Sequence, residues 1–279
     1  MNKINILIAY PYFSKAVIKK LREMERCEYR LIVDSGAFTA WNTGKKIELD
    51  DYCKFLDSIS EFAPYRAVQL DVLGDPEKSW VNYKIMKERG YETMPVFTRG
   101  ESLETLELMY NETDYIMLGG VVVREKNKNY VKWFLNRNNG RKCHWLGFVN
   151  MPFIKHYKPE SVDSSSWKSA VRFGKLSLYK GNGEITIINK HVFKKKPDTV
   201  TANRFEKLGL NPDNIRKISE NDSWGNKGYA HQVSTISHLY RSFEVEKKLG
   251  TKIYLATAST LNLTCLIEAK RHLYKKGII

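Results

Sequence analysis

The chain has few cysteines and no long apolar segment. The cysteines, none of which forms a Cys-x-x-Cys pair or lies at metal-ligand spacing from a histidine, are Cys27, Cys53, Cys143 and Cys265. Their scatter argues against a zinc cage and against a disulfide framework, and it fits a reducing cytoplasm. No apolar run approaches the roughly 18 residues that cross a bilayer. The opening segment MNKINILIAY lacks a signal-peptide cleavage pattern.

Acidic residues are also scarce relative to basic ones. The 279 residues include 46 Lys and Arg against 31 Asp and Glu, which gives a formal net charge of +15. This excess favours a polyanionic partner over a small neutral solute, although a lysine-rich composition can produce such a surface without one. We expect nucleic acid as the partner, no membrane association and a cytoplasmic location.

Short apolar runs alternate with helical patterns along most of the chain. Residues 76–90 and 101–113 have helical patterns, and Pro76 and Gly90 mark the ends of the first. The runs are rich in Val and Ile and fit the buried strands of a parallel sheet. The candidate strands are 5–10, 29–34, 66–71, 93–97, 115–120, 143–149, 161–163 and 252–258. Eight strands alternating with helices predict an α/β fold, a single (β/α)8 TIM barrel spanning residues 1–279.

The alternation breaks between about 164 and 250, which predicts an insertion before the last strand. Residues 175–189 read KLSLYKGNGEITIIN, a pattern that predicts a β-hairpin around Gly181-Asn182-Gly183. A basic helical stretch at 223–249 then leads to the last strand and to a closing helix at 261–275. The cations that we expect to contact a nucleic-acid backbone, with salt-dependent binding, are Lys194 to Lys196, Arg204, Lys207, Arg216, Lys217, Lys227 and Arg241.

Three of the candidate strands end in aspartate, at Asp34, Asp71 and Asp163, and a fourth ends in Gly119-Gly120. Active sites of (β/α)8 barrels lie at the carboxyl ends of the strands. One carboxylate kept ionised by hydrogen bonds can attack an anomeric carbon, while another with a raised pKa exchanges a proton. The same groups can hold a magnesium ion or cap helices. The residues alone leave these alternatives open.

Five motifs occur in a fixed order around these aspartates. They are DSGAFTAW (34–41), Asp71, YIMLGGVV (115–122), HWLGFVN (144–150), and SVDSSSWKSAVRFG followed by the hairpin segment (161–189). In this order and context they resemble the tRNA-guanine transglycosylase superfamily, which includes queuine tRNA-ribosyltransferase-like enzymes. That family consists of (β/α)8 barrels that exchange a guanine in nucleic acid for a 7-deazaguanine base. The resemblance covers roughly residues 30 to 190.

The resemblance implies roles for the aspartates. Asp163 would be the nucleophile that attacks C1′ of the target nucleotide and expels guanine. Asp34 would be the general acid and base, and Asp71 would accept hydrogen bonds from the donors on the Watson–Crick edge of the base. The remaining base-binding positions implied by the motifs are Ser35, Gly36, Leu118, Gly119 and Gly120.

Aromatic and basic residues complete the expected site. Phe38, Trp41 and Phe97 are candidates to stack on a flipped base, although aromatic residues are more often part of a hydrophobic core. Arg172 matches a phosphate-binding arginine of the family, and Lys168 lies about one position from another.

The sequence departs from the tRNA-modifying enzymes in two places. Their Cys-x-Cys-x-x-Cys plus His zinc site has no counterpart, so we expect no metal and no other cofactor. Their Val-Gln-Gly-Gly base-reading strand is replaced by PVFTRGE (95–101), where Thr98 or Arg99 is a candidate substitute for the missing amide. Both departures resemble the branch that inserts 7-deazaguanines into DNA, in phages and in bacterial modification systems.

These observations predict a DNA-guanine transglycosylase. It would take a free 7-deazaguanine base, such as 7-cyano-7-deazaguanine, in a bacterial or phage-infected cell. Three alternatives stay open: the same exchange on tRNA, a glycosylase that passes the sugar to water, and a non-catalytic nucleic-acid-binding barrel. Homodimer formation, which is frequent in the family, also stays open.

Overall fold

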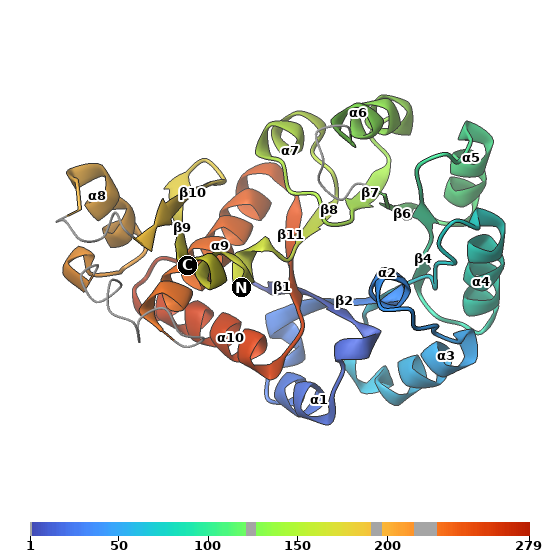
Figure 1. The fold of residues 1–279 in the computed structure, drawn as a ribbon, viewed down its shortest axis with the longest axis horizontal. Helices are drawn as coiled ribbons and strands as arrows, with labels where there is room; N and C mark the ends of the chain where they lie inside the picture. Colours follow the sequence, from blue (N-terminus) through green and yellow to red (C-terminus); the bar gives the residue numbers. More distant parts are fainter. Residues whose placement is uncertain (1, 121–126, 191–196, 215–227) are drawn as a thin grey trace.

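The computed structural model describes residues 2–120, 127–190, 197–214 and 228–279. At its centre, nine parallel strands form a nearly closed barrel with helices outside it (Figure 1). The strands, in the hydrogen-bonded order β4-β3-β2-β1-β11-β8-β7-β6-β5, are β1 (Ile4–Ala9), β2 (Tyr29–Asp34), β3 (Arg66–Val68), β4 (Thr93–Met94), β5 (Val96–Phe97), β6 (Tyr115–Leu118), β7 (Lys142–Trp145), β8 (Ser161–Ser164) and β11 (Lys252–Thr257).

Pro95 divides one barrel strand into β4 and β5. Proline has no backbone N–H to donate to a neighbouring strand, whereas its carbonyl still accepts one from Met117, at 2.8 Å. β4 pairs with β3, and β5 pairs with β6. The two short strands therefore share one of eight positions around the barrel, and the predicted α/β TIM-barrel fold is confirmed.

Apart from the short helix at 37–42, the helices between the strands form the outer layer (Figure 1). Side-chain oxygens of Ser14, Asp75, Ser102, Asn150 and Ser259 accept hydrogen bonds from the first turns of their helices, which fixes where those helices begin. The helices are α1 (Lys15–Arg22), α2 (Ala37–Asn42), α3 (Leu49–Ser58), α4 (Pro76–Glu88), α5 (Leu103–Glu112), α6 (Asn127–Asn138), α7 (Met151–Tyr157), α9 (Tyr229–Leu249) and α10 (Thr260–Lys275). None of the helices in the described ranges is both long and apolar enough to cross a membrane.

Side chains alternate between the interior of the barrel and its outer face. The interior cluster contains residues from several strands, including Leu7, Ile32, Val68, Met117 and Tyr254. Because side chains on a strand alternate with a period of two, Asp34 shares the inner face with Ile32.

The predicted hairpin is present beside the barrel. β9 (Lys175–Gly181) and β10 (Glu184–Asn189) form a separate antiparallel sheet, and α8 (Thr199–Lys207) follows them in the chain (Figure 1). Leu176 and Leu178 of β9 belong to the same core cluster as Val233 and Ile236 of α9. Helix α9 lies in the chain between β8 and β11, so it connects the hairpin to the barrel.

Three strands, β3, β6 and β7, end two or more residues earlier than the sequence predicted. β3 stops at Val68 and β7 at Trp145, so Asp71 lies on the loop after β3 and the prediction that it ends a strand is wrong. Helix α4 holds this loop: Asn82 donates to the Leu70 carbonyl at 2.8 Å, and the hydroxyl of Ser79 accepts from the Val72 N–H at 2.8 Å. These contacts replace further strand pairing.

Candidate active site

Asp163 lies on β8 at the carboxyl end of the barrel, and its side chain is held through one oxygen. Its Oδ1 accepts the N–H of Gly147 at 2.6 Å and lies 3.2 Å from Nε2 of His144. Within the described ranges, no hydrogen bond reaches Oδ2. The indole of Trp167 is fully buried and donates to the Ala256 carbonyl at 3.0 Å, which anchors the turn after Asp163 to β11. The carboxylate is thus fixed in orientation through Oδ1, while Oδ2 has no hydrogen-bond partner among the described residues.

A buried polar chain leads away from Asp163 into the barrel. His144 of β7 is fully buried, and its Nδ1 contacts the hydroxyl of Ser161, which in turn contacts the hydroxyl of Tyr115. The ring of Tyr254 packs edge-on against the imidazole, with the ring centroids 5.8 Å apart, and restricts the rotation of His144. The sequence interpretation assigned no role to His144. The sequence feature that could have pointed to His144 is its position next to Trp145, at the carboxyl end of a buried strand.

Asp34 ends β2 and faces the same interior. Its Oδ1 accepts the Gly36 N–H at 2.5 Å. Burial raises the pKa of Asp34; the hydrogen bond from Gly36 opposes this, and the charge of Asp163 adds to it. The charge of Asp163 therefore acts on Asp34 at the carboxyl end of the barrel.

The turn at Gly36 requires glycine. Its φ is +76°, in the left-handed region, and a Cβ there would lie 2.5 Å from Cδ of Pro11. Ser35 is buried in the same turn. The DSG motif thus places a backbone N–H against Asp34 at a position that no larger residue could occupy without a shift.

Asp71 lies beside this group on its loop. Burial raises its pKa to about 7; Gln69, which donates to Oδ1 at 2.7 Å, opposes the shift, while the charges of Asp34 and Glu101 add to it. The hydroxyl of Tyr52 on α3 lies 3.2 Å from the Val33 carbonyl and 3.1 Å from the Val68 carbonyl. Helix α3 therefore links the carboxyl ends of β2 and β3, next to Asp34 and the loop that carries Asp71.

Glu101 is a carboxylate near this group that the sequence interpretation did not single out. It follows β5 within PVFTRGE, and it accepts hydrogen bonds from the backbone N–H and the hydroxyl of Thr98. Burial raises the pKa of Glu101 and the two Thr98 bonds lower it. Thr98 is therefore engaged by Glu101, and Glu101 contributes to the charge that Asp71 experiences.

The Leu118-Gly119-Gly120 segment packs against β5. A Cβ on Gly119 would lie 2.8 Å from Cγ1 of Val96, so the glycine permits close approach of the neighbouring strand. The Gly119 N–H donates to the Phe97 carbonyl at 2.8 Å, and the Leu118 carbonyl accepts from Leu146 at 3.1 Å. Gly120 is exposed, with a φ of +70°. Of the three residues, Gly120 has the backbone best placed to meet a ligand.

The prediction that Phe97 stacks on a base is wrong. Phe97 is fully buried and stacks on Trp133, with ring centroids 6.4 Å apart and an interplanar angle of 12°. Its neighbour Val96 belongs to the interior cluster, so alternation turns Phe97 toward the outer helices. Phe97 is a core residue.

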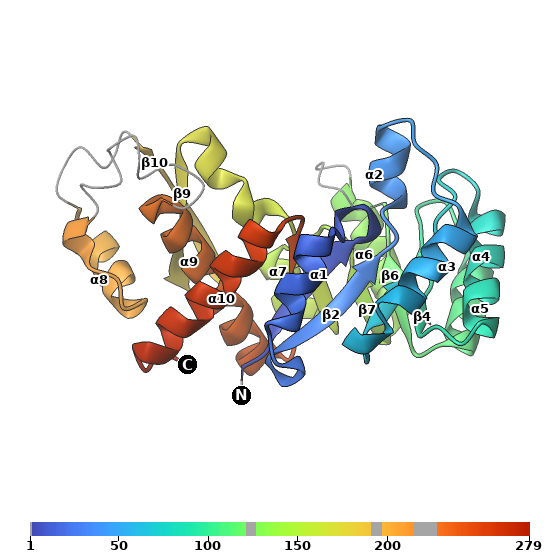
Figure 2. The ribbon, with the colours of Figure 1, turned by 90° about the horizontal axis from the view of Figure 1, so that it is seen from below.

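Phe38 and Trp41 are exposed on α2, which stands above the end of β2 (Figure 2). Their exposed fractions are 54% and 63%, and their ring centroids lie 6.4 Å apart. A cavity of about 580 Å³ adjoins this helix, within the size range of ligand sites. Its lining includes Trp41 and Asp71 but not Asp34 or Asp163. The cavity therefore meets the carboxylates at Asp71.

The cations predicted to contact phosphate differ in location and exposure. Lys168 is half-buried in the turn Ser166–Lys168 after Asp163, and Arg204 and Lys207 lie on α8. The Nε of Arg241 is buried in α9, and burial lowers the pKa of Arg241 to about 10, so this residue is not an open surface cation. The predicted cations that lie outside the described part of the chain are Lys194 to Lys196, Arg216, Lys217, Lys227 and the side chain of Arg172.

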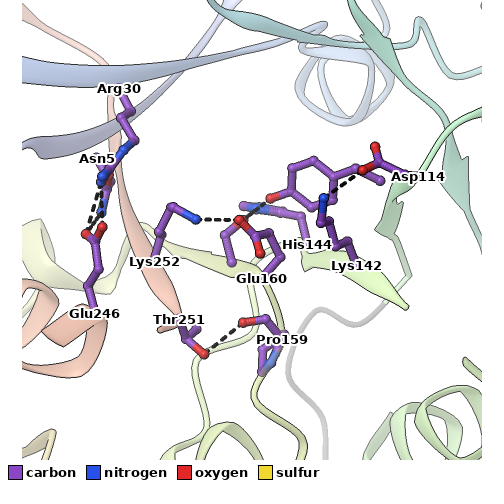
Figure 3. A network of polar contacts seen from close by, with 12 residues as sticks. Asn5, Arg30, Asp114, Lys142, His144, Pro159, Glu160, Glu246, Thr251 and Lys252 are labelled. Carbon is purple, nitrogen blue, oxygen red and sulfur yellow. Dashed lines mark hydrogen bonds and ion pairs between the residues drawn. The ribbon is translucent and has the colours of Figure 1, made fainter. Parts of the chain in front are cut away.

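At the opposite end of the barrel, carboxylates pair with cations (Figure 3). Glu246 contacts Arg30 at 2.8 Å, Asp114 contacts Lys142 at 2.7 Å, and Glu160 pairs with Lys252. The hydrogen bond from Lys142 lowers the pKa of Asp114. In the part of the chain that the structure describes, no cationic Lys or Arg pairs with Asp34, Asp71 or Asp163.

No group of three or more His, Cys, Asp or Glu side chains is arranged to hold a metal ion among the residues described. Comparison of the chain with protein-family models, with curated proteins and with solved structures gives no match.

Proposed function

We propose that the protein is a DNA-guanine transglycosylase that exchanges a guanine for a 7-deazaguanine base. The observation that carries this proposal is the pairing of two unlike carboxyl groups in one barrel mouth. Asp163 is held through Oδ1, with no hydrogen bond to Oδ2 from the described residues, and burial favours the protonated form of Asp34. Donors to a carboxylate stabilise its charged form, which is what a nucleophile needs.

The two groups divide the reaction between them. Oδ2 of Asp163 forms a bond to C1′ while the bond from C1′ to N9 of guanine breaks, and the proton of Asp34 goes to the departing purine. In the second half, Asp34 takes the proton from N9 of the incoming base as N9 bonds to C1′. The bond between C1′ and Asp163 then breaks, so two inversions give net retention at C1′.

Asp71 and the aromatic residues of α2 supply base recognition in this proposal. The N1–H and amino group of guanine are donors, which would favour the ionised form of Asp71 on binding. Phe38 and Trp41 are exposed, Trp41 lines the cavity, and both rings offer stacking surfaces for bases of the bound strand. Extruding the target guanosine from a duplex would cost a few kcal/mol.

The choice of DNA rests on sequence features. The motif order resembles the guanine transglycosylases, the zinc motif of the tRNA enzymes has no counterpart, and the net charge is +15. Exchange on tRNA uses the same carboxylates and is the second candidate.

The test is to incubate the protein with guanine-containing DNA, or with tRNA, and radiolabelled 7-cyano-7-deazaguanine, followed by nucleoside analysis. Label in DNA that requires Asp163 supports the proposal. Label confined to tRNA would overturn the choice of DNA, and abasic sites without label would identify a hydrolase. Binding without either product, unchanged in Asp163→Asn, would identify a non-catalytic barrel.

A further inference from the structure

We infer that His144 is a positioning residue, held by Ser161 and Tyr115 as the neutral tautomer with its proton on Nε2, so that Asp163 presents Oδ2 for attack. This inference rests on the proposed function for its catalytic consequence. Its structural part concerns four side chains inside the barrel and stands apart from any substrate.

The donors and acceptors available to the four linked side chains determine the tautomer of His144. A carboxylate only accepts, so Nε2 of His144 must carry the proton that it shares with Oδ1 of Asp163. Nδ1 is then an acceptor, and the hydroxyl of Ser161 donates to it. The Ser161 oxygen accepts in turn from Tyr115. With this direction of donation, the protons on His144, Ser161 and Tyr115 each have an acceptor.

The other forms of His144 leave a group unsatisfied. An Nδ1–H would donate to Ser161, Ser161 would donate to Tyr115, and the Tyr115 proton would have no acceptor among the described residues. With the proton on Nδ1 alone, the bare Nε2 would also face the carboxylate. An imidazolium has the same fault at Tyr115 and adds a buried charge, and unsatisfied buried groups cost free energy.

Burial prevents these side chains from replacing their hydrogen bonds with bonds to water. His144 and Ser161 have no exposed surface, and Tyr115 is 6% exposed. Tyr254 packs edge-on against the imidazole, so the ring cannot turn freely away from Asp163. Side chains in such a setting obtain their hydrogen bonds from one another.

The neutral form suits the chemistry proposed for Asp163. When Oδ2 bonds to C1′, the carboxylate loses its negative charge. A neutral donor on Oδ1 can remain in place, whereas an imidazolium would be left as an unpaired buried cation. His144 and the Gly147 N–H therefore orient the nucleophile through the whole exchange without transferring a proton.

The first test is NMR of the full-length protein labelled with ¹⁵N-histidine, with the His144 signal identified by its loss in His144→Gln. The two ring nitrogens report the tautomer without any substrate. We expect a neutral ring protonated on Nε2 at pH 7. In Ser161→Ala the proton should stay on Nε2, which still faces Asp163, while the Nδ1 resonance shifts because Nδ1 has lost the hydroxyl that donates to it. A ring protonated on Nδ1, an imidazolium at pH 7, or an unchanged Nδ1 resonance in Ser161→Ala would overturn the inference.

The second test separates positioning from folding by base-exchange kinetics. His144→Leu should lower kcat about 10²-fold with little change in KM, because misplacing a reacting group by about 1 Å has that effect. His144→Gln keeps a donor for Oδ1 and should recover part of the loss. An unchanged kcat in His144→Leu, or equal losses in both variants, would contradict positioning. If no exchange occurs in the wild type, the proposed function fails and the NMR result still decides the tautomer.

Discussion

The two ends of the barrel treat the same kind of side chain in opposite ways. At the amino end, Asp114 lies beside Lys142 and its pKa is lowered. At the carboxyl end, burial raises the pKa of Asp34, and that of Asp71 to about 7. The difference lies first in burial and then in the partner: Asp34 and Asp71 are buried beside other carboxylates, whereas Asp114 has a hydrogen bond from Lys142. An environment that disfavours the ionised form of a carboxylate is typical of functional sites. Carboxylates that are paired with cations are typical of structural contacts.

Replacing the proposed nucleophile should have the largest effect. Asp163→Asn keeps the shape of the side chain but removes the nucleophilic charge, and we expect base exchange to fall by about 10⁴-fold or more. Radiolabel incorporation into DNA measures the loss. A variant that folds normally and retains exchange within tenfold would show that the mouth is not used as proposed.

Asp34→Asn should have the next largest effect. The amide cannot give a proton to the departing purine, and general acid–base catalysis contributes roughly 10²- to 10⁴-fold. The rate measured in single-turnover assays should fall by that factor while DNA binding is retained. Full activity in this variant would remove Asp34 from the chemistry and leave it a structural role at the Gly36 turn.

Asp71 should make stability depend on pH. Its pKa rises from 3.8 in the ordinary case to about 7 in the folded protein. Between these values the folded state holds a proton that the unfolded chain releases, so the free energy of unfolding falls as pH rises. The slope from this one group is at most about 1.4 kcal/mol per pH unit.

Urea unfolding between pH 4 and 8 measures this slope in the wild type and in Asp71→Asn. The substitution removes the titrating group, so the fall in stability across this window should become shallower in the variant. Identical profiles for the two proteins would contradict the raised pKa of Asp71.

An acid at the amino end should show the reverse pattern, with a small effect on stability and none on chemistry. Glu246→Gln weakens the contact with Arg30, and partly exposed ion pairs contribute about 1 kcal/mol or less. We expect the free energy of unfolding to fall by about that amount, with kcat within twofold of wild type. Loss of activity at unchanged stability would erase the proposed difference between the ends.

Strand periodicity predicted much of this molecule. The eight apolar runs predicted the barrel, and their terminal aspartates predicted a cluster that includes Asp34 and Asp163. The ends of the strands were harder to predict, because apolar residues such as Leu70 and Phe148 continue past β3 and β7 to fill the core. Asp71 was therefore placed in a strand that ends three residues earlier.

Which face a side chain occupies could not be predicted where the strands are short. Pro95 interrupts β4 and β5, so two residues on either side give no periodicity to place Phe97. His144 was missed for another reason: its partners Ser161 and Asp163 lie on β8, and a single histidine in an apolar strand carries no sign of them. Partners that lie on different strands become apparent only in the folded barrel.

The central claim is that Oδ2 of Asp163 attacks C1′, and trapping the intermediate tests it most directly. The full-length protein is mixed with guanine-containing DNA, without added base, and the reaction is quenched by rapid denaturation. Intact mass and peptide mapping should then show one DNA-linked species, with the sugar attached at Asp163. Attachment at another residue, or exchange that proceeds with no covalent species in the wild type, would contradict the account.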